Sequence, residues 1–357
     1  MSTMDGQNYA PKGKPTPVCE QGEFLVGVIG LDHGHIYGMC NGLTEAGAVV
    51  VSVFDEDTAK AKAFVEAFPS ATIAKSKEEV LADPAIHLIA SASIANERGP
   101  LGLEALDAGK DYFSDKPPFT TREQVQAARA KVKETGLKWF VYYSERIHVE
   151  AAVYAEQLLK DGAIGELVSL RGWGPHRLQA ANRPAWFFDR ERYGGIITDI
   201  GSHQVEQMLH FSGATDATVV SSRVANLHHP EYPGLEDYGD ACLTTDTGIP
   251  CYLCLDWFTP DGLGTWGDGR FFLIGTKGYI ELRKYIDVAA SKDGDNVIVV
   301  NDDGEQHFRV TGKVGFPFFG RVIRDSLDRT ETAMSQEHTF RAIEIAIEAQ
   351  TNALRIG

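Results

Sequence analysis

The sequence predicts a two-domain α/β protein, with a parallel sheet in its first part and a large, mostly antiparallel open sheet in its second. Its 357 residues exceed what one ordinary hydrophobic core takes up. Short apolar runs alternate with helical segments before residue 146, which is typical of parallel sheets. From Asp216 onward, strand-like runs are separated by turn sequences, which is typical of antiparallel pairing. We therefore expect an arm at 1–22, an α/β domain at 23–146 and an α+β domain at 147–357, whose C-terminal helix could pack back on the first domain.

Composition narrows the class of partner. The net charge of −16 argues against binding to nucleic acid or to an anionic membrane surface. No apolar run reaches membrane-spanning length, and the polar segment 1–20 lacks the apolar core of a signal peptide. These features predict a cytoplasmic protein with a flexible or surface-lying arm. The five cysteines are an odd, scattered set, which predicts reduced thiols; Cys251 and Cys254 lie in a strand-like run, and we expect no metal there.

The first domain has the layout of a dinucleotide-binding (Rossmann) unit. An apolar strand at 24–29 ends at Gly30, a helical segment follows, and a second strand at 49–54 ends at Asp55. An acid at that point would accept ribose hydroxyl groups and repel a 2′-phosphate, which favours NAD over NADP. Asp32 and His35 replace two glycines of the fingerprint, so the Asp32 side chain must turn away from a pyrophosphate or cap the helix. A flavodoxin-like turn that binds no dinucleotide is the alternative.

Later strand ends supply further cofactor candidates, because ligands of such sheets lie at the carboxyl ends of the strands. One strand is expected at 87–93, before a helix at 101–108. Another, at 111–114, runs into Asp115-Lys116-Pro117-Pro118, where the prolines forbid a helix and fix the backbone around Lys116. The expected cofactor contacts are Gly30, Asp32, His33, His35, Asp55, Ser91, Ser93, Asn96, Asp115 and Lys116.

The stretch 193–203 is the main candidate for chemistry. Gly194 and Gly195 would let the backbone approach a flat ligand, and the apolar residues after them recur at helical spacing. In a helix, Asp199 and His203 would stand four residues apart on one face, where a carboxylate can orient and tune an imidazole for general acid/base catalysis. The alternative is an acid near a helix N-terminus and a histidine with a structural role.

The ordered set Gly27-Val28-Ile29-Gly30, Asp115-Lys116-Pro117, Tyr193-Gly194-Gly195 and Asp199-x-Gly201-x-His203 resembles the glucose–fructose oxidoreductase / inositol dehydrogenase / rhizopine-catabolism (Gfo/Idh/MocA) superfamily. The resemblance runs from about Phe24 to the end of the chain, and Asp115 stands where that family usually has Glu. It implies that Lys116, Asp199 and His203 are catalytic. It also implies a homodimer or homotetramer formed through the sheet of the second domain.

A segment rich in aromatic and basic residues precedes the candidate catalytic stretch. Aromatic faces stack on sugar C–H groups, and the donors bind hydroxyl groups or an anion. Arg177 and Arg183 have no acid nearby in sequence, which favours an anionic sugar; the alternative is a surface loop packed on a domain interface. A glycine-rich loop at 259–270 could close over the same site. The expected substrate contacts are Trp173, His176, Arg177, Arg183 and Trp186.

Together these features predict an NAD-dependent oxidoreductase acting on a secondary CH–OH group of a sugar, sugar acid or cyclitol. His203 would take the hydroxyl proton, Lys116 would polarise the oxygen, and Asp199 would orient both. Some members of the similar family are glycoside hydrolases that oxidise a sugar transiently, so an NAD-dependent glycosidase acting on a glycoside, including an anionic or sulfonated one, is an alternative. A sugar or nucleotide sensor without catalysis is a third.

Overall fold

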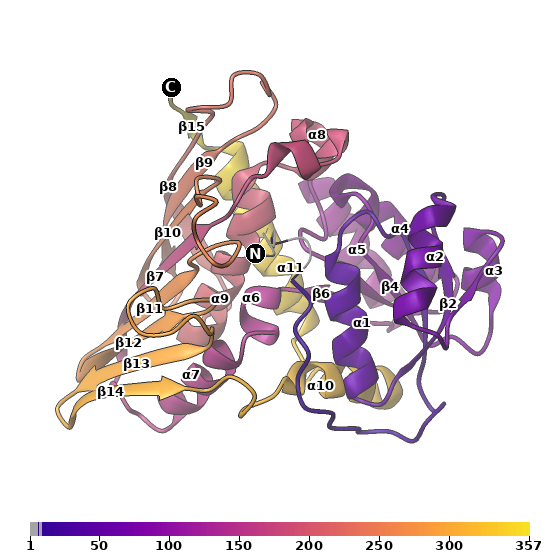
Figure 1. Cartoon of the computed structure of the whole chain (residues 1–357), viewed down its shortest axis with the longest axis horizontal. Helices are drawn as coiled ribbons and strands as arrows, with labels where there is room; N and C mark the ends of the chain where they lie inside the picture. The colour runs from indigo at the N-terminus through magenta and orange to yellow at the C-terminus, as the bar shows by residue number, and fades with distance from the viewer. Residues whose placement is uncertain (1–5, 7–8) are drawn as a thin grey trace. The chain divides into compact units, whose positions relative to one another are not determined.

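The computed structural model describes residue 6 and residues 9–357, so part of the expected arm, residues 1–5 and 7–8, lies outside the described residues. The chain forms two compact units. The N-terminal unit comprises Gln7–Tyr142 and Phe316–Phe340, and the C-terminal unit is built mainly from Tyr143–Gly315 and Arg341–Gly357. Figure 1 labels their helices and strands.

A six-stranded parallel sheet organises the N-terminal unit, in the order β3-β2-β1-β4-β5-β6. This order confirms the predicted Rossmann fold, and it reverses direction between β1 and β4, where such sheets bind their ligands. All residues of β4, β5 and β6 are buried, so the chain covers both faces of these strands. The strands are β1 (Leu25–Ile29), β2 (Val49–Phe54), β3 (Thr72–Ile73), β4 (Leu88–Ser91), β5 (Asp111–Asp115) and β6 (Trp139–Tyr142).

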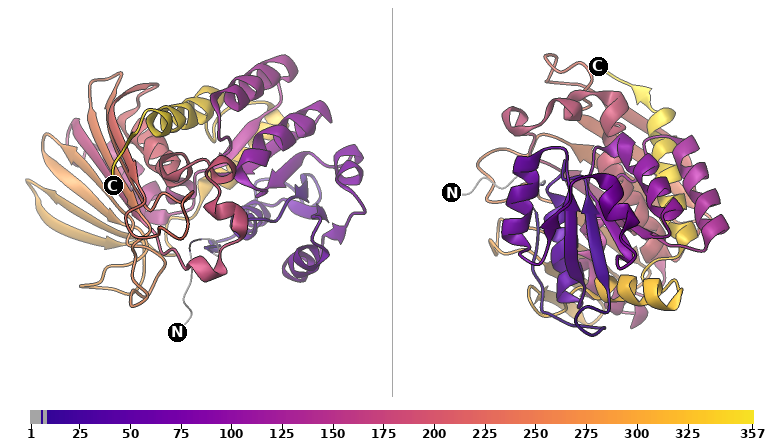
Figure 2. Two further views of the ribbon diagram at one scale, coloured as in Figure 1. Left: turned by 90° about the horizontal axis from the view of Figure 1, so that it is seen from above. Right: turned by 90° about the vertical axis from the view of Figure 1, so that its right-hand side faces the viewer.

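The helices of this unit begin and end at residues suited to capping. The side chains of Asp57, Ser76 and Thr121 accept hydrogen bonds from amides in the first turns of α2, α3 and α5, and Gly136 ends α5 in the left-handed conformation. The right-hand view of Figure 2 shows the helices beside the indigo and purple strands. They are α1 (His35–Glu45), α2 (Thr58–Ala67), α3 (Lys77–Ala82), α4 (Ala95–Asp107), α5 (Arg122–Thr135), α10 (Pro317–Asp328) and the first part of α11 (Gln336–Thr351).

Helix α4 begins six residues before the expected start at 101. Pro100 lies inside it and cannot donate a hydrogen bond to the carbonyl of Asn96. The side chain of Gln124 donates to that carbonyl instead, at 2.8 Å. The helix therefore continues through a proline because a side chain from α5 replaces the missing hydrogen bond.

A nine-stranded mixed sheet organises the C-terminal unit, in the order β14-β13-β12-β11-β7-β10-β9-β8-β15. Two neighbouring pairs, β7–β10 and β8–β15, are parallel and the others are antiparallel, which confirms the predicted mostly antiparallel sheet. Its twist is visible in the left view of Figure 2. The strands are β7 (Leu167–Pro175), β8 (Ala217–Ala225), β9 (Tyr238–Thr245), β10 (Pro250–Asp256), β11 (Arg270–Gly275), β12 (Gly278–Arg283), β13 (Asn296–Asn301), β14 (Gly304–Arg309) and β15 (Leu354–Arg355).

Helices of the same unit cover one face of this sheet. Helix α9 (Ser202–Ser212) packs on β7 and β10, and α7 (Glu150–Lys160) packs on β12 and β13. Gly172 and Gly174 of β7 face α9, because a Cβ at either position would meet Gln204 or Ile200. Shorter helices complete the unit, namely α6 (Ser144–Ile147), η2 (Ala180–Asn182), η3 (Ala185–Phe188), α8 (Arg190–Tyr193) and the π-helical turn η4 (Ile197–Gly201).

The opposite face of the sheet carries exposed apolar side chains, Val168, Trp173, Val220 and Tyr279. Self-association through this sheet stays a prediction. Within the described part of the chain, no helix combines the length and the apolar character needed to cross a bilayer. All five cysteines are free thiols, as expected.

Candidate functional site

The turn after β1 shows why glycine is required at residue 30. Gly30 has a φ of 84°, and a Cβ there would lie 2.7 Å from the Cβ of Ser93 at the end of β4. Its amide donates to Phe54 O at 3.1 Å, and Ala92 N donates to Gly30 O at 3.1 Å. The turn is thus held between the ends of β2 and β4, where a dinucleotide-binding unit needs close backbone approach.

Acidic side chains near this turn have defined partners. The Asp32 carboxylate pairs with Lys60 Nζ of α2 at 2.6 Å and does not cap α1, which has no side-chain cap hydrogen bond. Asp55 accepts hydrogen bonds from the amides of Leu31 and Asp57, at 2.6 and 2.8 Å. Asp55 therefore stands at the end of β2, where an adenosine ribose would be read.

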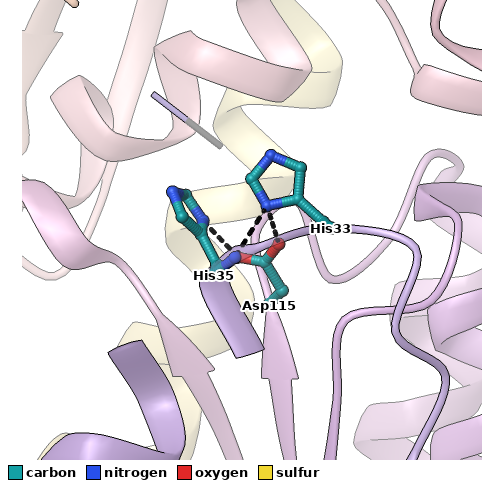
Figure 3. A group of neighbouring side chains, drawn as sticks. All are labelled: His33, His35 and Asp115. Carbon is teal, nitrogen blue, oxygen red and sulfur yellow. Dashed lines mark hydrogen bonds and ion pairs between the residues drawn. The ribbon is translucent and has the colours of Figure 1, made fainter. Parts of the chain in front are cut away.

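Asp115, at the end of β5, is a fully buried hydrogen-bond hub. His35 Nδ1 and His33 Nδ1 lie 2.8 and 3.1 Å from its two carboxylate oxygens, and the Lys116 amide donates to it at 2.7 Å. Figure 3 shows both imidazoles turning one ring nitrogen toward the carboxylate. Arg98 Nη2 adds an ion pair at 3.2 Å. Asp115 has no exposed surface and positions its neighbours through these contacts; its contact with a cofactor stays a prediction.

The hub has a defined charge state. Burial opposes ionisation of Asp115, but His35, Arg98 and His33 together hold its pKa well below the ordinary value. Burial, with His35 adding to it, lowers the pKa of His33 to about 3, so this imidazole is neutral at pH 7. His33 Nδ1 also accepts a hydrogen bond from the His35 amide, at 3.3 Å, so this ring nitrogen links the start of α1 to the hub.

The ligand atoms of His33, His35 and Asp115 lie within 4.8 Å of one another, and these residue types can hold a metal ion. Arg98 argues against that use, because its guanidinium already lies against the carboxylate at 3.2 Å. The N–H donors of the hub also occupy the oxygens that a cation would need. The cluster is better described as a hydrogen-bonded support for the turn after β1 and for Lys116.

Arg98 was missed in the sequence, where it is one charged residue in a helical segment. Its side chain is 1% exposed and donates to Ser93 O at 2.7 Å and Pro117 O at 3.1 Å. It also donates to the main-chain carbonyl of Lys116. Arg98 thereby joins the ends of β4 and β5 and fixes the backbone that carries Lys116, whose side chain is also buried.

The remaining cofactor candidates lie at the end of β4 and the start of α4. Ser91 is buried and its hydroxyl donates to that of Ser93 at 3.2 Å, so Ser91 supports the turn from within. Asn96 stands in the first turn of α4 with its Oδ1 atom buried and without a hydrogen bond among the described residues. Asn96 is thus the candidate here that keeps an acceptor available.

In the C-terminal unit, the glycines at 194 and 195 serve the backbone. Gly194 ends α8 with a φ of 92°, and Gly195 has a φ of 95°. A Cβ at Gly195 would lie 2.4 Å from Gln350 of α11. A left-handed backbone at both positions, and close packing at Gly195, thus account for these glycines, and the approach of a flat ligand stays a prediction.

Asp199 and His203 occupy two successive helical turns. Asp199 lies on the π-helical turn η4, and His203 lies in the first turn of α9. A π-turn is uncommon and recurs at functional sites. His203 is 2% exposed and its ring lies 6.5 Å from that of Tyr143, edge to face. The two candidates thus come from neighbouring turns, although the first is not α-helical.

The expected substrate contacts separate into different places. His176 is buried at the end of β7, where its Nδ1 lies 3.0 Å from Gly174 O and its ring packs on Trp257 and Trp266. Trp173 alternates to the face of β7 opposite α9, against Phe272, and its contact with a substrate stays a prediction. Trp186 lies in η3, half-buried, and its role stays a prediction.

The two arginines hold the loops around them. Arg177 donates to the carbonyls of Pro260 and Leu263 at 2.9 and 2.6 Å, and so ties down the loop at 259–270. Arg183 donates to Leu178 O and Arg177 O, and its guanidinium stacks on two aromatic rings, those of Phe187 and Trp257. These contacts give both arginines a structural role.

A second buried cluster, absent from the sequence-based site, lies beside His203. Lys284 Nζ pairs with Glu145 Oε2 at 2.6 Å, and Gln204 Nε2 donates to the same oxygen at 2.8 Å. Lys284 is 1% exposed and Glu145 2%. Because 139 positions separate the two charges, no local sequence signal could have paired them.

Two family descriptions match the chain. Residues 24–143 match an oxidoreductase family with an NAD-binding Rossmann fold, and residues 152–281 match the GFO/IDH/MocA C-terminal domain. Among curated proteins, scyllo-inositol 2-dehydrogenase (NAD(+)) of Bacillus subtilis is 26% identical over 92% of this chain and 94% of its own. D-xylose dehydrogenase of Paenarthrobacter nicotinovorans is 29% identical, but over 35% of this chain and only 34% of its own length.

Solved structures agree on the fold. A protein of Erwinia carotovora atroseptica SCRI1043 is 48% identical, with a TM-score of 0.91 over 94% of this chain and 100% of its own. Levoglucosan dehydrogenase in complex with NADH is 16% identical, with a TM-score of 0.74 over 92% of this chain and 98% of its own. A 3-ketoreductase of Actinomadura kijaniata in complex with NADP is 20% identical, with a TM-score of 0.72 over 93% and 98%.

Proposed function

Since the chain belongs to the Gfo/Idh/MocA oxidoreductase family, we propose that it is an NAD-dependent oxidoreductase acting on a secondary CH–OH group of a neutral sugar or cyclitol. One observation carries the proposal: Lys116 and His203, to which the sequence resemblance assigns catalytic roles, are both buried, at 6% and 2% exposure. The relatives named for scyllo-inositol and D-xylose support the substrate class.

In this proposal each residue has one task. The His203 imidazole takes the hydroxyl proton at a ring nitrogen while the C–H bond breaks. The Lys116 ammonium stabilises charge on the oxygen, and the Arg98 and Asp115 contacts fix its backbone. Asp199, one turn before His203, orients the imidazole. NAD, when bound, supplies the hydride acceptor.

The residues at the strand ends fit a dinucleotide. The Gly30 turn leaves no room for a Cβ, Asp32 is neutralised by Lys60, and α1 begins without a side-chain cap, where a helix N-terminus suits a diphosphate. Asp55 would accept bonds from the adenosine ribose, and its charge would repel a 2′-phosphate. NAD is therefore proposed over NADP.

Calorimetric titration should show NAD binding at least about tenfold tighter than NADP. The Asp55 carboxylate would repel the 2′-phosphate, and a repulsion of about 1.4 kcal/mol corresponds to a tenfold weaker Kd. Asp55→Asn keeps the size of the side chain and removes its charge, so this variant should narrow the preference. Tighter binding of NADP than of NAD to the wild-type protein would remove the assignment.

The contacts of the arginines favour a neutral substrate over an anionic one. Arg177 and Arg183 direct guanidinium N–H groups at main-chain carbonyls, and the Arg183 guanidinium also lies over two aromatic rings. A carboxylate or phosphate would have to displace those bonds. If the two arginines do not bind the substrate, the buried cluster beside His203 remains, and its hydrogen-bond acceptors suit hydroxyl groups.

In a spectrophotometric assay at 340 nm, kcat/KM for the better of scyllo-inositol and D-xylose should exceed that for D-glucuronate by about tenfold or more, the discrimination expected from an unpaired buried charge. Arg192→Ala, which changes an arginine next to Glu191 and outside the proposed site, should keep the same ratio. Preferred turnover of D-glucuronate would restore the anion site.

A further inference from the structure

The two carboxylate oxygens of Glu145 differ: one accepts from two hydrogen-bond donors and the other from none. Oε2 receives Lys284 Nζ at 2.6 Å and Gln204 Nε2 at 2.8 Å. Oε1 is buried and has no hydrogen-bond partner among the residues that the structure describes. A buried acceptor without a donor costs about 1–3 kcal/mol, and more when it is charged. An incoming donor would recover that free energy.

The carboxylate is charged in the folded protein. Burial opposes its ionisation, but Lys284, His203 and His176 lower the pKa of Glu145 to about 2. Two of these three groups were expected at the site from the sequence, so Glu145 lies within electrostatic reach of the proposed base and of a proposed substrate contact. An anion in such a position accepts strong, charge-assisted hydrogen bonds.

In a neighbouring buried ion pair, both oxygens of the carboxylate have a hydrogen-bond donor. Arg146 follows Glu145 in α6 and pairs with Glu206 of α9, which lies two residues beyond Gln204. Arg146 Nε lies 2.7 and 2.9 Å from the two oxygens of Glu206. Two adjacent residues thus join the same two helices, but only Glu145 keeps an oxygen without a donor. The difference points to a ligand.

We propose that Glu145 is a substrate-binding residue whose Oε1 atom accepts a hydrogen bond from a hydroxyl group of a neutral polyol, while Lys284 and Gln204 hold the carboxylate in place. This inference rests on the proposed function, which it deepens by assigning the recognition of an uncharged hydroxylated substrate. It also explains why a lysine is buried in the C-terminal unit: Lys284 neutralises an acid that must stay ionised.

The test uses the charge-neutral double variant Glu145→Gln/Lys284→Met, which avoids leaving either charge alone. D-glucose, D-xylose and scyllo-inositol are titrated calorimetrically into the NAD-loaded protein, and the tightest of them is compared with its monodeoxy analogues. The double variant should bind the parent compound about 10- to 100-fold more weakly, the range for a hydrogen bond to a charged group. For one monodeoxy analogue the loss should be less than about threefold, because that compound lacks the recognised hydroxyl group.

The matched control is Arg146→Met/Glu206→Gln, which removes the adjacent, fully bonded pair and should keep the wild-type ratio between parent and deoxy compounds. An equal loss for every compound in the Glu145 variant, or no loss, would overturn the assignment, as would failure of all three probes to bind the wild-type protein. If the sugar binds selectively and this selectivity depends on Glu145, but no NADH forms, the proposed oxidoreductase activity is contradicted and the inference about Glu145 is supported. If NADH forms at the same rate in the Glu145 variant as in the wild-type protein, the oxidoreductase activity is supported and the inference about Glu145 is contradicted.

Discussion

Replacing His203 with alanine should lower kcat/KM on the best neutral sugar by about 100-fold or more, because general-base assistance contributes about that factor. Lys116→Ala should cause a loss of similar size by removing the cation beside the reacting oxygen. Asp199→Asn should lower kcat more than it changes KM, since it orients the base and does not bind the sugar in this proposal. Initial rates of NADH formation measure all three.

His210→Ala provides the control for this series. His210 lies on the same helix α9, half-buried, with its Nε2 3.3 Å from Glu156, and it has no role in the proposed chemistry. That variant should keep near wild-type kcat, and thermal unfolding should show that the His203 variant is folded. Full activity of folded His203→Ala would mean that another group accepts the proton.

Asp115→Asn should destabilise the protein by about 3–5 kcal/mol, the cost of leaving a buried charge without its partner. The charge is that of Arg98, which is 1% exposed and would lose the carboxylate with which it forms its ion pair. Urea unfolding measures the loss. Asp32→Asn breaks the more exposed pair with Lys60 and should cost about 1 kcal/mol or less. Equal losses of unfolding free energy in the two variants would contradict the claim that Asp115 balances a buried charge.

The residues around Asp115 also predict how the free energy of unfolding in urea depends on pH. The folded protein keeps His33 neutral down to about pH 3, whereas the unfolded chain protonates it below its ordinary value of 6.5. Between those values the unfolded state binds the extra proton, so stability falls as the pH is lowered, by about 1.4 kcal/mol per pH unit. His33→Asn should flatten this slope. The Asp115 contribution is lost only at lower pH, because its folded pKa is depressed below the ordinary carboxyl value.

The sequence identified residues whose roles follow from strand ends and local pattern. Gly30, Asp55 and Lys116 stand at the carboxyl ends of predicted parallel strands, and the topology brings such ends to one edge of the sheet. The charge of Asp32, which the sequence marked as unsuited to a pyrophosphate, is paired with Lys60. The bounds of helix α5 follow from local capping residues, because the Thr121 side chain accepts a hydrogen bond at its start and Gly136 ends it.

The sequence could not reveal features that depend on distant partners. The start of α4 depends on Gln124 replacing a hydrogen bond that Pro100 cannot make. The buried Glu145–Lys284 pair joins residues from different elements, and neither residue has a distinctive neighbour in sequence. The face of β7 on which Trp173 lies could not be read from the sequence, because it follows from the packing of Gly172 and Gly174 against α9.

Product analysis with NAD and a neutral glycoside tests the central claim most directly. The wild-type protein is incubated with excess NAD and either scyllo-inositol, D-xylose or p-nitrophenyl β-D-glucoside, while NADH absorbance and released nitrophenol are followed together. A net oxidoreductase produces NADH in proportion to the oxidised sugar, over many turnovers and without release of nitrophenol, and this is the result we predict. Release of nitrophenol without net NADH would contradict it, because the hydride would then have returned to the sugar as in an NAD-dependent glycosidase.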